Sequence, residues 1–345
     1  MSRKISVGII GTGWIGEIRA KVCANHPLVE SLHVAEIDSA KLARVGEETR
    51  AKTATTDYRE LLRRNDIDAI FVCSTPETTH YPIAKDCLLA RKHVLLEKPM
   101  GLALNEADEM MALAKKAGLK FTIGYTQRFN PKYAYVKRCL VDGTLGRPVT
   151  ALVSRNVSRS IGNKIGGRIR LSPAVMEATH DIDFILWCLD GLKPVRVYSE
   201  AVYRIMQETH GVPDCQWIMV TMEDGTVFTV GAGWALPPGY PHFSTTTIEW
   251  VATDGALLID DSHRDILLNT IKGGMVLPLS TMPGEQVGHV FQGPMEAETV
   301  HFIEAVALDR PLLVTPEQAR QVMEVTLAAD LSAERHQPVS LPLES

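Results

Sequence analysis

Three glycines, a lysine and a histidine stand in short motifs whose residue types suit particular chemistry. Gly11, Gly13 and Gly16 form a G-x-G-x-x-G turn after an apolar run, whereas Lys98 and His180 are titratable groups in polar motifs further along. Oxidation of an alcohol removes a hydride and a proton from one carbinol, so a dinucleotide must take the hydride and a base the proton. Together the motifs indicate nicotinamide-dependent redox chemistry.

The glycine turn predicts where a dinucleotide binds. Gly11 permits the tight turn, Gly13 lets the backbone approach a pyrophosphate, and Gly16 lets the following helix pack close to the strand. The N-terminus of that helix also favours phosphate charge. We assign the whole turn to the cofactor site: Gly11, Thr12, Gly13, Trp14, Ile15 and Gly16.

An acidic residue near the end of the next strand predicts the type of cofactor. Asp38 follows Gly16 by 22 residues. Its carboxylate can accept hydrogen bonds from the adenosine ribose diol and would repel a 2′-phosphate. We therefore expect NAD, with NADP less favoured.

A second loop follows another apolar strand at the edge where such sheets bind ligands. Here Ser74, Thr75 and Pro76 precede His80, and all four are assigned to the cofactor site. The structural alternative, in which Pro76 begins a helix and His80 caps or packs it, is compatible with this role.

Further motifs indicate a resemblance to a known family. Glu97-Lys98-Pro99 follows a strand, Q-R-F-x-P spans 127–131, and H-D-x-D spans 180–183, all in order after the glycine turn and T-P-x-x-x-H. A T-P-E loop lies at 315–317. In this order, over nearly the whole chain, the sequence resembles the Gfo/Idh/MocA family, which includes glucose–fructose oxidoreductase and the inositol dehydrogenases.

The resemblance implies an enzyme with its active site between two domains. Such members oxidise a secondary alcohol of a sugar or cyclitol, or run the reverse reduction, with Lys98 and His180 beside the nicotinamide. A lysine partly removed from water beside a cationic ring can accept a proton near neutrality. The assignments are Lys98, His180 and Glu177 as catalytic; Glu97, Lys98 and Gln127 as cofactor-binding; and Lys98, Arg128, Asn156, Glu177, His180 and Tyr240 as substrate-binding.

One position departs from the family pattern. Inositol dehydrogenase-like members carry an aspartate four residues before the histidine, and this chain has Met176 there. We expect a continuous helix over 173–190, with Ser172 as its N-cap and Gly191 as its stop. On that helix Glu177 lies within reach of His180 and is predicted as its partner or as a substrate ligand, with Asp183 as the alternative.

Several other polar and aromatic residues are candidates for the substrate site. Arg155 and Asn156 fall on a predicted strand and could recognise a carboxylate or phosphate, although a solvated loop is the simpler interpretation. Trp234, Tyr240 and His242 lie near the Pro-Pro-Gly turn at 237–239. Core packing is the default for this group.

The elements that position these residues follow from hydrophobic patterning. Over 1–124, apolar runs alternate with helix-like stretches, which predicts an α/β Rossmann domain with a doubly wound parallel sheet. Over 125–345, β-branched alternating runs predominate, and Asp224-Gly225 marks a hairpin. The second part is therefore predicted to be an α+β domain, for substrate binding and oligomerisation, with a large open, mostly antiparallel sheet.

Composition limits the partners. The formal charge of −5 over 345 residues gives no basic surface for nucleic acid, and no apolar run is long enough to span a membrane. Six scattered cysteines without a C-x-x-C pair indicate reduced, mostly buried thiols and a cytoplasmic location. No metal site is expected, and the resemblance implies a homodimer or homotetramer through the C-terminal sheet.

Two other functions fit the same motifs. One is a reductase of an imine or dihydrodiol-type substrate, which needs the same hydride geometry. The other is a catalytically silent dinucleotide-binding regulator, which Met176 favours and Lys98 with His180 disfavours.

Overall fold

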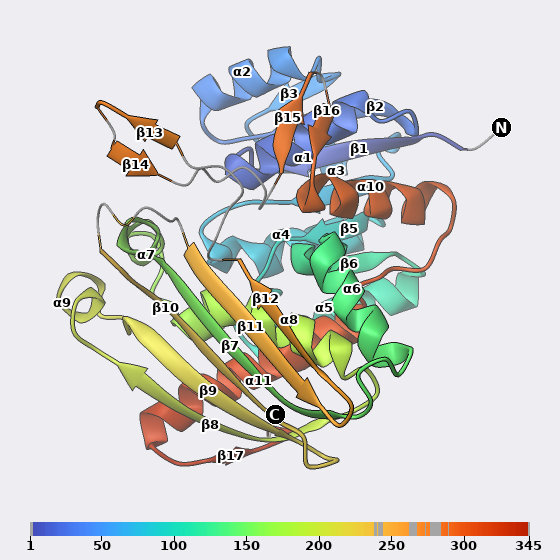
Figure 1. Ribbon diagram of the computed structural model, residues 1–345. Coiled ribbons are helices and arrows are strands. Elements are labelled where there is room, and N and C mark those ends of the chain that lie inside the picture. Colours follow the sequence, from blue (N-terminus) through green and yellow to red (C-terminus); the bar gives the residue numbers. More distant parts are fainter. Residues whose placement is uncertain are drawn as a thin grey trace. The chain divides into compact units, whose positions relative to one another are not determined.

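The computed structural model describes residues 3–237, 240, 244–261, 268–272, 274–276, 284–288 and 290–343. The chain divides into two compact units (Figure 1). The first comprises Met1–Asn130 with Thr281–Arg320, and the second Pro131–Ser280 with Gln321–Ser345. The predicted boundary at 124 lies close to the first crossing point. The return of residues 281–320 to the first unit differs from the continuous second domain expected over 125–345.

A six-stranded parallel sheet forms the centre of the first unit, in the order β3-β2-β1-β4-β5-β6. The strands are β1 (Ile5–Ile10), β2 (Val29–Ala35), β3 (Thr53–Thr55), β4 (Ala69–Val72), β5 (His93–Leu96) and β6 (Phe121–Ile123). Every residue of β1 and β4 is buried, as expected for strands covered on both faces. The doubly wound Rossmann prediction is confirmed.

Helices connect these strands. They are α1 (Trp14–Asn25), α2 (Ser39–Glu48), α3 (Tyr58–Leu62), α4 (His80–Leu89) and α5 (Leu104–Ala117), with short 3-10 turns η1 (Glu77–Thr79) and η2 (Thr126–Phe129). The sequence pattern does not indicate β3, α2 or α3, because these elements are short or only weakly apolar. Gly118 ends α5 in the left-handed conformation (φ +65°), which glycine adopts without strain.

The returning segment packs into the first unit through α10 (Pro294–Ala307). Phe302 and Ile303 belong to the same apolar core as β1 and β4, and Phe302 meets the ring of Phe71 edge-on at 5.1 Å. The hairpin of β15 (Glu285–Val287) and β16 (Val290–Gln292) lies beside α1 (Figure 1). Burial of this apolar helix face explains why the segment leaves the second unit.

The second unit is built on a seven-stranded sheet in the order β12-β11-β7-β10-β9-β8-β17. Its strands are β7 (Pro148–Ser158), β8 (Pro194–Val202), β9 (Cys215–Met222), β10 (Val227–Leu236), β11 (Ser244–Ala252), β12 (Ala256–Asp260) and β17 (Val339–Ser340). Only β7 and β10 pair in parallel, so the mostly antiparallel prediction is confirmed. The Asp224-Gly225 turn joins β9 to β10, with Gly225 at φ +91°.

Helices cover one face of this sheet and leave the other open (Figure 1). The helical segments are α6 (Pro131–Val141), α7 (Arg159–Gly166), η3 (Ala174–Ala178), α8 (Thr179–Cys188) and α9 (Met206–His210), followed by α11 (Pro316–Arg335), which begins in the first unit. A second hairpin is formed by β13 (Leu268–Thr270) and β14 (Gly274–Val276). Of the described helices, none is both long and apolar enough to cross a membrane.

The predicted helix over 173–190 is not uniform. Ala174–Ala178 form a π-helical turn, and regular α-helix begins only at Thr179. Ser172 caps the segment as predicted, because its Oγ accepts a hydrogen bond from Val175 N at 3.2 Å. A helical-wheel projection at 100° per residue assumes a regular α-helix. It therefore misplaces the side chains of the first turns, because a π turn holds an extra residue.

Candidate active site

The glycine turn is shaped to hold a phosphate. A Cβ on Gly11, whose φ is +86°, would lie 2.8 Å from the carbonyl oxygen of Cys73, and one on Gly16 would lie 1.9 Å from that of Gly11. A Cβ on Gly13 would meet nothing within 4 Å. Gly13 is also the N-cap of α1 and has no side-chain cap. Gly11 and Gly16 are thus needed for close packing, while Gly13 leaves space at a helix N-terminus for an anionic group.

Three further loops, which begin at Cys73, Glu97 and Gly124, lie at the same edge of the sheet as the glycine turn. Hydrogen bonds at 2.8 to 2.9 Å continue the strand pairing just past the strand ends, from Gly11 N to Ala35 O, Cys73 N to Ile10 O, Glu97 N to Val72 O and Gly124 N to Leu96 O. Parallel strands place their carboxyl ends together, so the structure gathers the glycine turn, the 73–76 loop and the Glu97-Lys98 segment.

The carboxylate beside the glycine turn belongs to Glu36, which directly follows β2. Its Oε2 accepts hydrogen bonds from Thr12 N at 2.6 Å and Thr12 Oγ1 at 3.0 Å. Partial burial would raise the pKa of Glu36, but the hydrogen bonds from Asp38 N and Thr12 N outweigh it and lower that pKa. Glu36 is therefore an anion held at the glycine turn, and it is not among the residues predicted for the cofactor site.

Asp38, the residue predicted for the ribose, occupies a different position. It is the N-cap of α2, where its Oδ1 accepts from Ala40 N at 3.0 Å and Lys41 N at 3.1 Å. The backbone bond from Lys41 is the main cause of its lowered pKa. Counting residues from the turn led to Asp38, whereas the signal that points to Glu36 is an acidic residue immediately after the apolar strand.

His80 connects two of the loops. Its buried ring places Nδ1 2.7 Å from Pro99 O and Nε2 3.0 Å from Ser74 O. Burial is the main cause that lowers the pKa of His80. Ser74 Oγ also lies 2.7 Å from Thr79 Oγ1, and Thr75 is exposed. The histidine thus ties the loop after β4 to the segment that carries Lys98.

The Glu97-Lys98 segment is anchored by a hydrogen bond from Arg19 of α1. Glu97 Oε1 accepts from Arg19 Nε at 3.0 Å, and both Glu97 and Lys98 keep partial exposure. A Cβ on Gly124 would lie 3.0 Å from Glu97 Oε2, so that glycine leaves room for the carboxylate.

The Q-R-F residues lie in η2, where Gln127 and Arg128 are buried. Arg128 Nη1 donates to Leu313 O at 3.0 Å and to Gln318 Oε1 at 2.7 Å, and Gln127 is 5% exposed. These contacts tie η2 to the returning segment. They give Arg128 a structural role, and its predicted substrate contact stays a prediction.

In the second unit, the helical segment around H-D-x-D is buried on almost all sides. Over residues 173–189 only Glu177 and His180 retain partial exposure. Trp234 Nε1 donates to Glu177 Oε1 at 2.9 Å, which fixes that carboxylate against β10. Met176 is buried in an apolar cluster with Trp234, as expected from core packing. The two polar groups predicted for catalysis are therefore the ones that this segment presents.

The residue after His180 anchors the segment to the sheet. Asp181 Oδ2 and Oδ1 accept from Arg155 Nε at 2.6 Å and Arg155 Nη2 at 2.7 Å, and both side chains are buried. The Arg155 guanidinium is thus paired with a carboxylate of its own unit, and its positive charge is balanced there.

Asn156 is placed differently from our expectation, whereas the assignment of Tyr240 to the substrate stays a prediction. Because side chains alternate along β7, Asn156 lies on the face opposite to Arg155, away from α8. Tyr240 is 41% exposed and donates its backbone N–H to Pro237 O. Residues 238, 239 and 241–243, including His242, lie outside the described residues.

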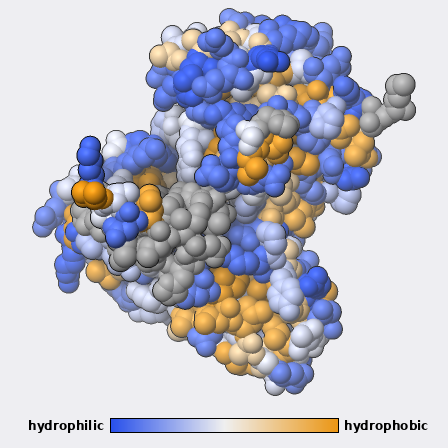
Figure 2. Space-filling model, turned by 45° about the horizontal axis from the view of Figure 1, so that its top comes forward, coloured by the Kyte–Doolittle hydropathy of each residue, from blue (hydrophilic) through white to orange (hydrophobic). Residues whose placement is uncertain are grey.

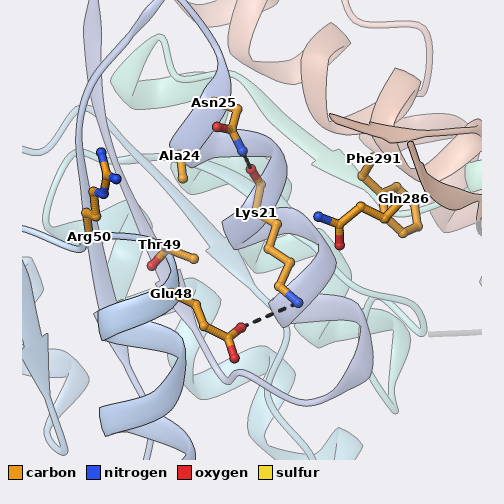
Figure 3. Close-up of a pocket in the computed structure, with 8 residues that line it drawn as sticks. All are labelled: Lys21, Ala24, Asn25, Glu48, Thr49, Arg50, Gln286 and Phe291. Atoms are coloured by element: carbon orange, nitrogen blue, oxygen red, sulfur yellow. Dashed lines mark hydrogen bonds and ion pairs between the residues drawn. The ribbon is translucent and has the colours of Figure 1, made fainter. Parts of the chain in front are cut away.

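Away from the glycine turn, a cavity of about 530 Å³ lies at the other end of α1 (Figure 3). It is lined by Lys21, Ala24, Asn25, Glu48, Thr49, Arg50, Gln286 and Phe291. Its Lys21 ammonium is already paired with Glu17 at 2.8 Å and Glu48 at 3.5 Å. The cavity lacks the glycine cradle, so we do not assign the cofactor to it. Nowhere in the described part of the chain do three His, Cys, Asp or Glu side chains form a group that could hold a metal ion.

Comparison with known proteins covers most of the chain. The model of an oxidoreductase family with an NAD-binding Rossmann fold matches residues 5–125, and that of the GFO/IDH/MocA C-terminal domain matches residues 133–258. An uncharacterised oxidoreductase of Bacillus subtilis, YrbE, is 25% identical over 99% of this chain and 98% of its own length. The scyllo-inositol 2-dehydrogenase (NAD(+)) of the same organism is 24% identical over 100% and 98%.

The fold has close counterparts among solved structures. The scyllo-inositol dehydrogenase of Lactobacillus casei, solved with NAD(H) and scyllo-inositol, superposes with a TM-score of 0.83 at 22% identity. The match covers 98% of this chain and 99% of that one.

Proposed function

Because this chain belongs to the Gfo/Idh/MocA family of oxidoreductases, we propose that it is an NAD-dependent dehydrogenase acting on a ring hydroxyl. The substrate class is a cyclitol, a sugar or a related hydroxylated ring. Two dehydrogenases similar to this chain over nearly their full length are named for scyllo-inositol, which supports a cyclitol. The departure at Met176 leaves the particular cyclitol open.

The observation that carries the cofactor assignment is the cradle at the glycine turn. Gly13 provides space at the N-terminus of α1, and the Glu36 carboxylate lies at the same turn. We propose that the turn binds the pyrophosphate and that Glu36, in place of Asp38, binds the adenosine ribose diol. A carboxylate there disfavours a 2′-phosphate, so NAD is preferred over NADP.

The bound nicotinamide supplies the hydride acceptor or donor. The chain supplies the proton transfer, which we assign to Lys98 Nζ and to the imidazole of His180. Lys98 lies between two anchored residues, since Arg19 holds Glu97 and His80 holds Pro99. Glu177, fixed by Trp234, accompanies His180 as a substrate ligand.

Absorbance at 340 nm tests the proposal directly. Purified protein with NAD and a panel of scyllo-inositol, myo-inositol, aldoses and sugar acids is expected to form NADH with at least one of them. A protein that binds NAD but reduces it with none would instead favour the silent regulator. Turnover of NADH with a cyclic imine alone would favour the reductase.

We also propose that the open face of the seven-stranded sheet joins copies of the chain into a homodimer or homotetramer. One row across this face presents Leu258 of β12, Leu152 of β7, Met219 of β9 and Tyr198 of β8, each at least 36% exposed, with Glu249 of β11 and Thr229 of β10 between them. Trp217 on β9 adds an indole that is 47% exposed. Figure 2 shows apolar side chains gathered on the unit that carries this sheet. Exposed apolar side chains gathered on one face, with few charged residues among them, are typical of a subunit interface.

A further inference from the structure

A network of side-chain bonds centred on the buried Arg19 joins four parts of the first unit. Arg19 lies on α1, two turns after the glycine turn begins, and none of its side chain is exposed. Its Nε and Nη2 donate to Glu97 Oε1, at 3.0 and 2.5 Å. Its Nη2 also donates to Glu298 Oε2 at 2.5 Å, and its Nη1 to Thr299 Oγ1 at 3.0 Å. One guanidinium therefore bridges the helix of the glycine turn, the segment carrying Lys98, and α10.

Glu298 extends the connection to a fourth element. Its Oε2 also accepts from Thr126 Oγ1 at 3.1 Å, at the start of the Q-R-F turn. Among the described residues its other oxygen, Oε1, is buried without a hydrogen-bond partner. Burial raises the pKa of Glu298 to about 7 in spite of the Arg19 charge. Replacing a buried ion pair by apolar residues of similar volume is often neutral or stabilising, so packing stability alone does not account for a glutamate at position 298.

The ring packing keeps Arg19 in one orientation. Its guanidinium carbon lies 5.9 Å from the centre of the Phe71 ring, and Phe302 of α10 meets that ring edge-on. Several charge-assisted bonds from a planar group and an aromatic neighbour restrict a guanidinium more than an ammonium, so lysine could not reproduce the arrangement. The position of Glu97 therefore depends on Arg19 and Glu298, which are 279 positions apart in sequence.

We propose that Arg19 and Glu298 are positioning residues that fix Glu97 and, through it, the backbone of Lys98. The inference rests on the proposed function, because it assigns Lys98 to the nicotinamide end of the cofactor. It makes the returning segment a part of the active site although none of its side chains is assigned to substrate. The adenosine end of the cofactor is assigned to the backbone of the glycine turn and to Glu36, neither of which accepts or donates a side-chain bond in the Arg19 network.

The test compares two ligands that differ only at the nicotinamide end. NADH and ADP-ribose are titrated by calorimetry into the full chain carrying Arg19→Lys or Glu298→Gln. The glutamine matches the neutral carboxyl in shape, so this variant carries the test if Arg19→Lys does not fold. In either variant we expect the affinity for NADH relative to ADP-ribose to fall at least about threefold, with ADP-ribose binding within about twofold of the wild type.

Thr49→Val is the matched control, because it removes a buried hydroxyl bond, from Oγ1 to Val45 O at 2.6 Å, that is not part of the network. It should leave the affinity ratio unchanged. A ratio that moves less than about threefold in both test variants overturns the proposal, as does an equal shift in the control. Failure of the proposed function is distinct, since a wild type that binds NADH and oxidises no polyol still yields the ratio.

Discussion

Replacing Glu36 by glutamine tests which carboxylate selects the cofactor. The change keeps the shape of the side chain and removes its charge, while leaving an oxygen that can still accept from Thr12. A hydrogen bond to a charged group contributes about 1.5 to 3 kcal/mol, compared with about 1 for a neutral one. Loss of the charge-assisted bonds to the ribose diol should therefore weaken NAD binding by about tenfold or more.

The same change should affect NADP in the opposite direction. Glu36 lies at the glycine turn as an anion, and its charge repels a 2′-phosphate. Glutamine removes this repulsion, so NADP should bind at least as tightly as to the wild type and the ratio of the two dissociation constants should fall. Calorimetric titration of both dinucleotides measures the ratio without a substrate.

Asp38→Asn is the matched control, with the same loss of charge two residues away. Asparagine is as good an N-cap as aspartate, so α2 should keep its cap and the cofactor preference should not change. A shift in preference in Asp38→Asn with none in Glu36→Gln would refute the assignment drawn from the structure. It would restore the one that we first made from spacing.

Four further variants test the other assignments. Lys98→Ala should lower kcat more than about tenfold, roughly 1.4 kcal/mol, whereas equal activity in the mutant would remove that lysine from the mechanism. Asp181→Asn leaves the Arg155 charge without its bidentate carboxylate and should cost about 3 to 5 kcal/mol in urea titrations; a loss under about 1 kcal/mol would contradict the weight given to this buried pair. Because the pKa of Glu298 is raised from 4.5 to about 7, the folded state binds more protons between those values and stability should fall as pH rises through them. Glu298→Gln should flatten that fall in a plot of melting temperature against pH, and an equally steep curve would argue against the raised pKa. Leu152→Glu should reduce the mass by light scattering to the 38.0 kDa of one chain, and an unchanged larger mass would exclude this face as the interface.

Local patterns in the sequence determined the overall plan. The glycine turn, the apolar strands after it and the Asp224-Gly225 hairpin are short-range signals, and each was found where predicted. Strand order follows from the same alternation, because parallel strands joined by helices can close in few ways. The motif residues at strand ends were also predictable, since the carboxyl edge of such a sheet gathers them.

Tertiary structure decided which partner each polar group takes. Asp38 and Glu36 are two residues apart and chemically alike, and only the bend of the chain after β2 sends one to a helix cap and the other to the glycine turn. The pairing of Arg155 with Asp181, the π turn before His180 and the burial of Arg128 likewise depend on packing between elements.

The return of residues 281–320 to the first unit depends on the most distant contacts of all. An amphipathic helix such as α10 shows in sequence that it needs an apolar surface, but not which of two surfaces it will cover. Burial against β1 and β4 decides that choice, and it brings Glu298 beneath Arg19. Periodicity is a property of neighbours along the chain, whereas the partner of a buried charge is set by whatever the completed core places beside it.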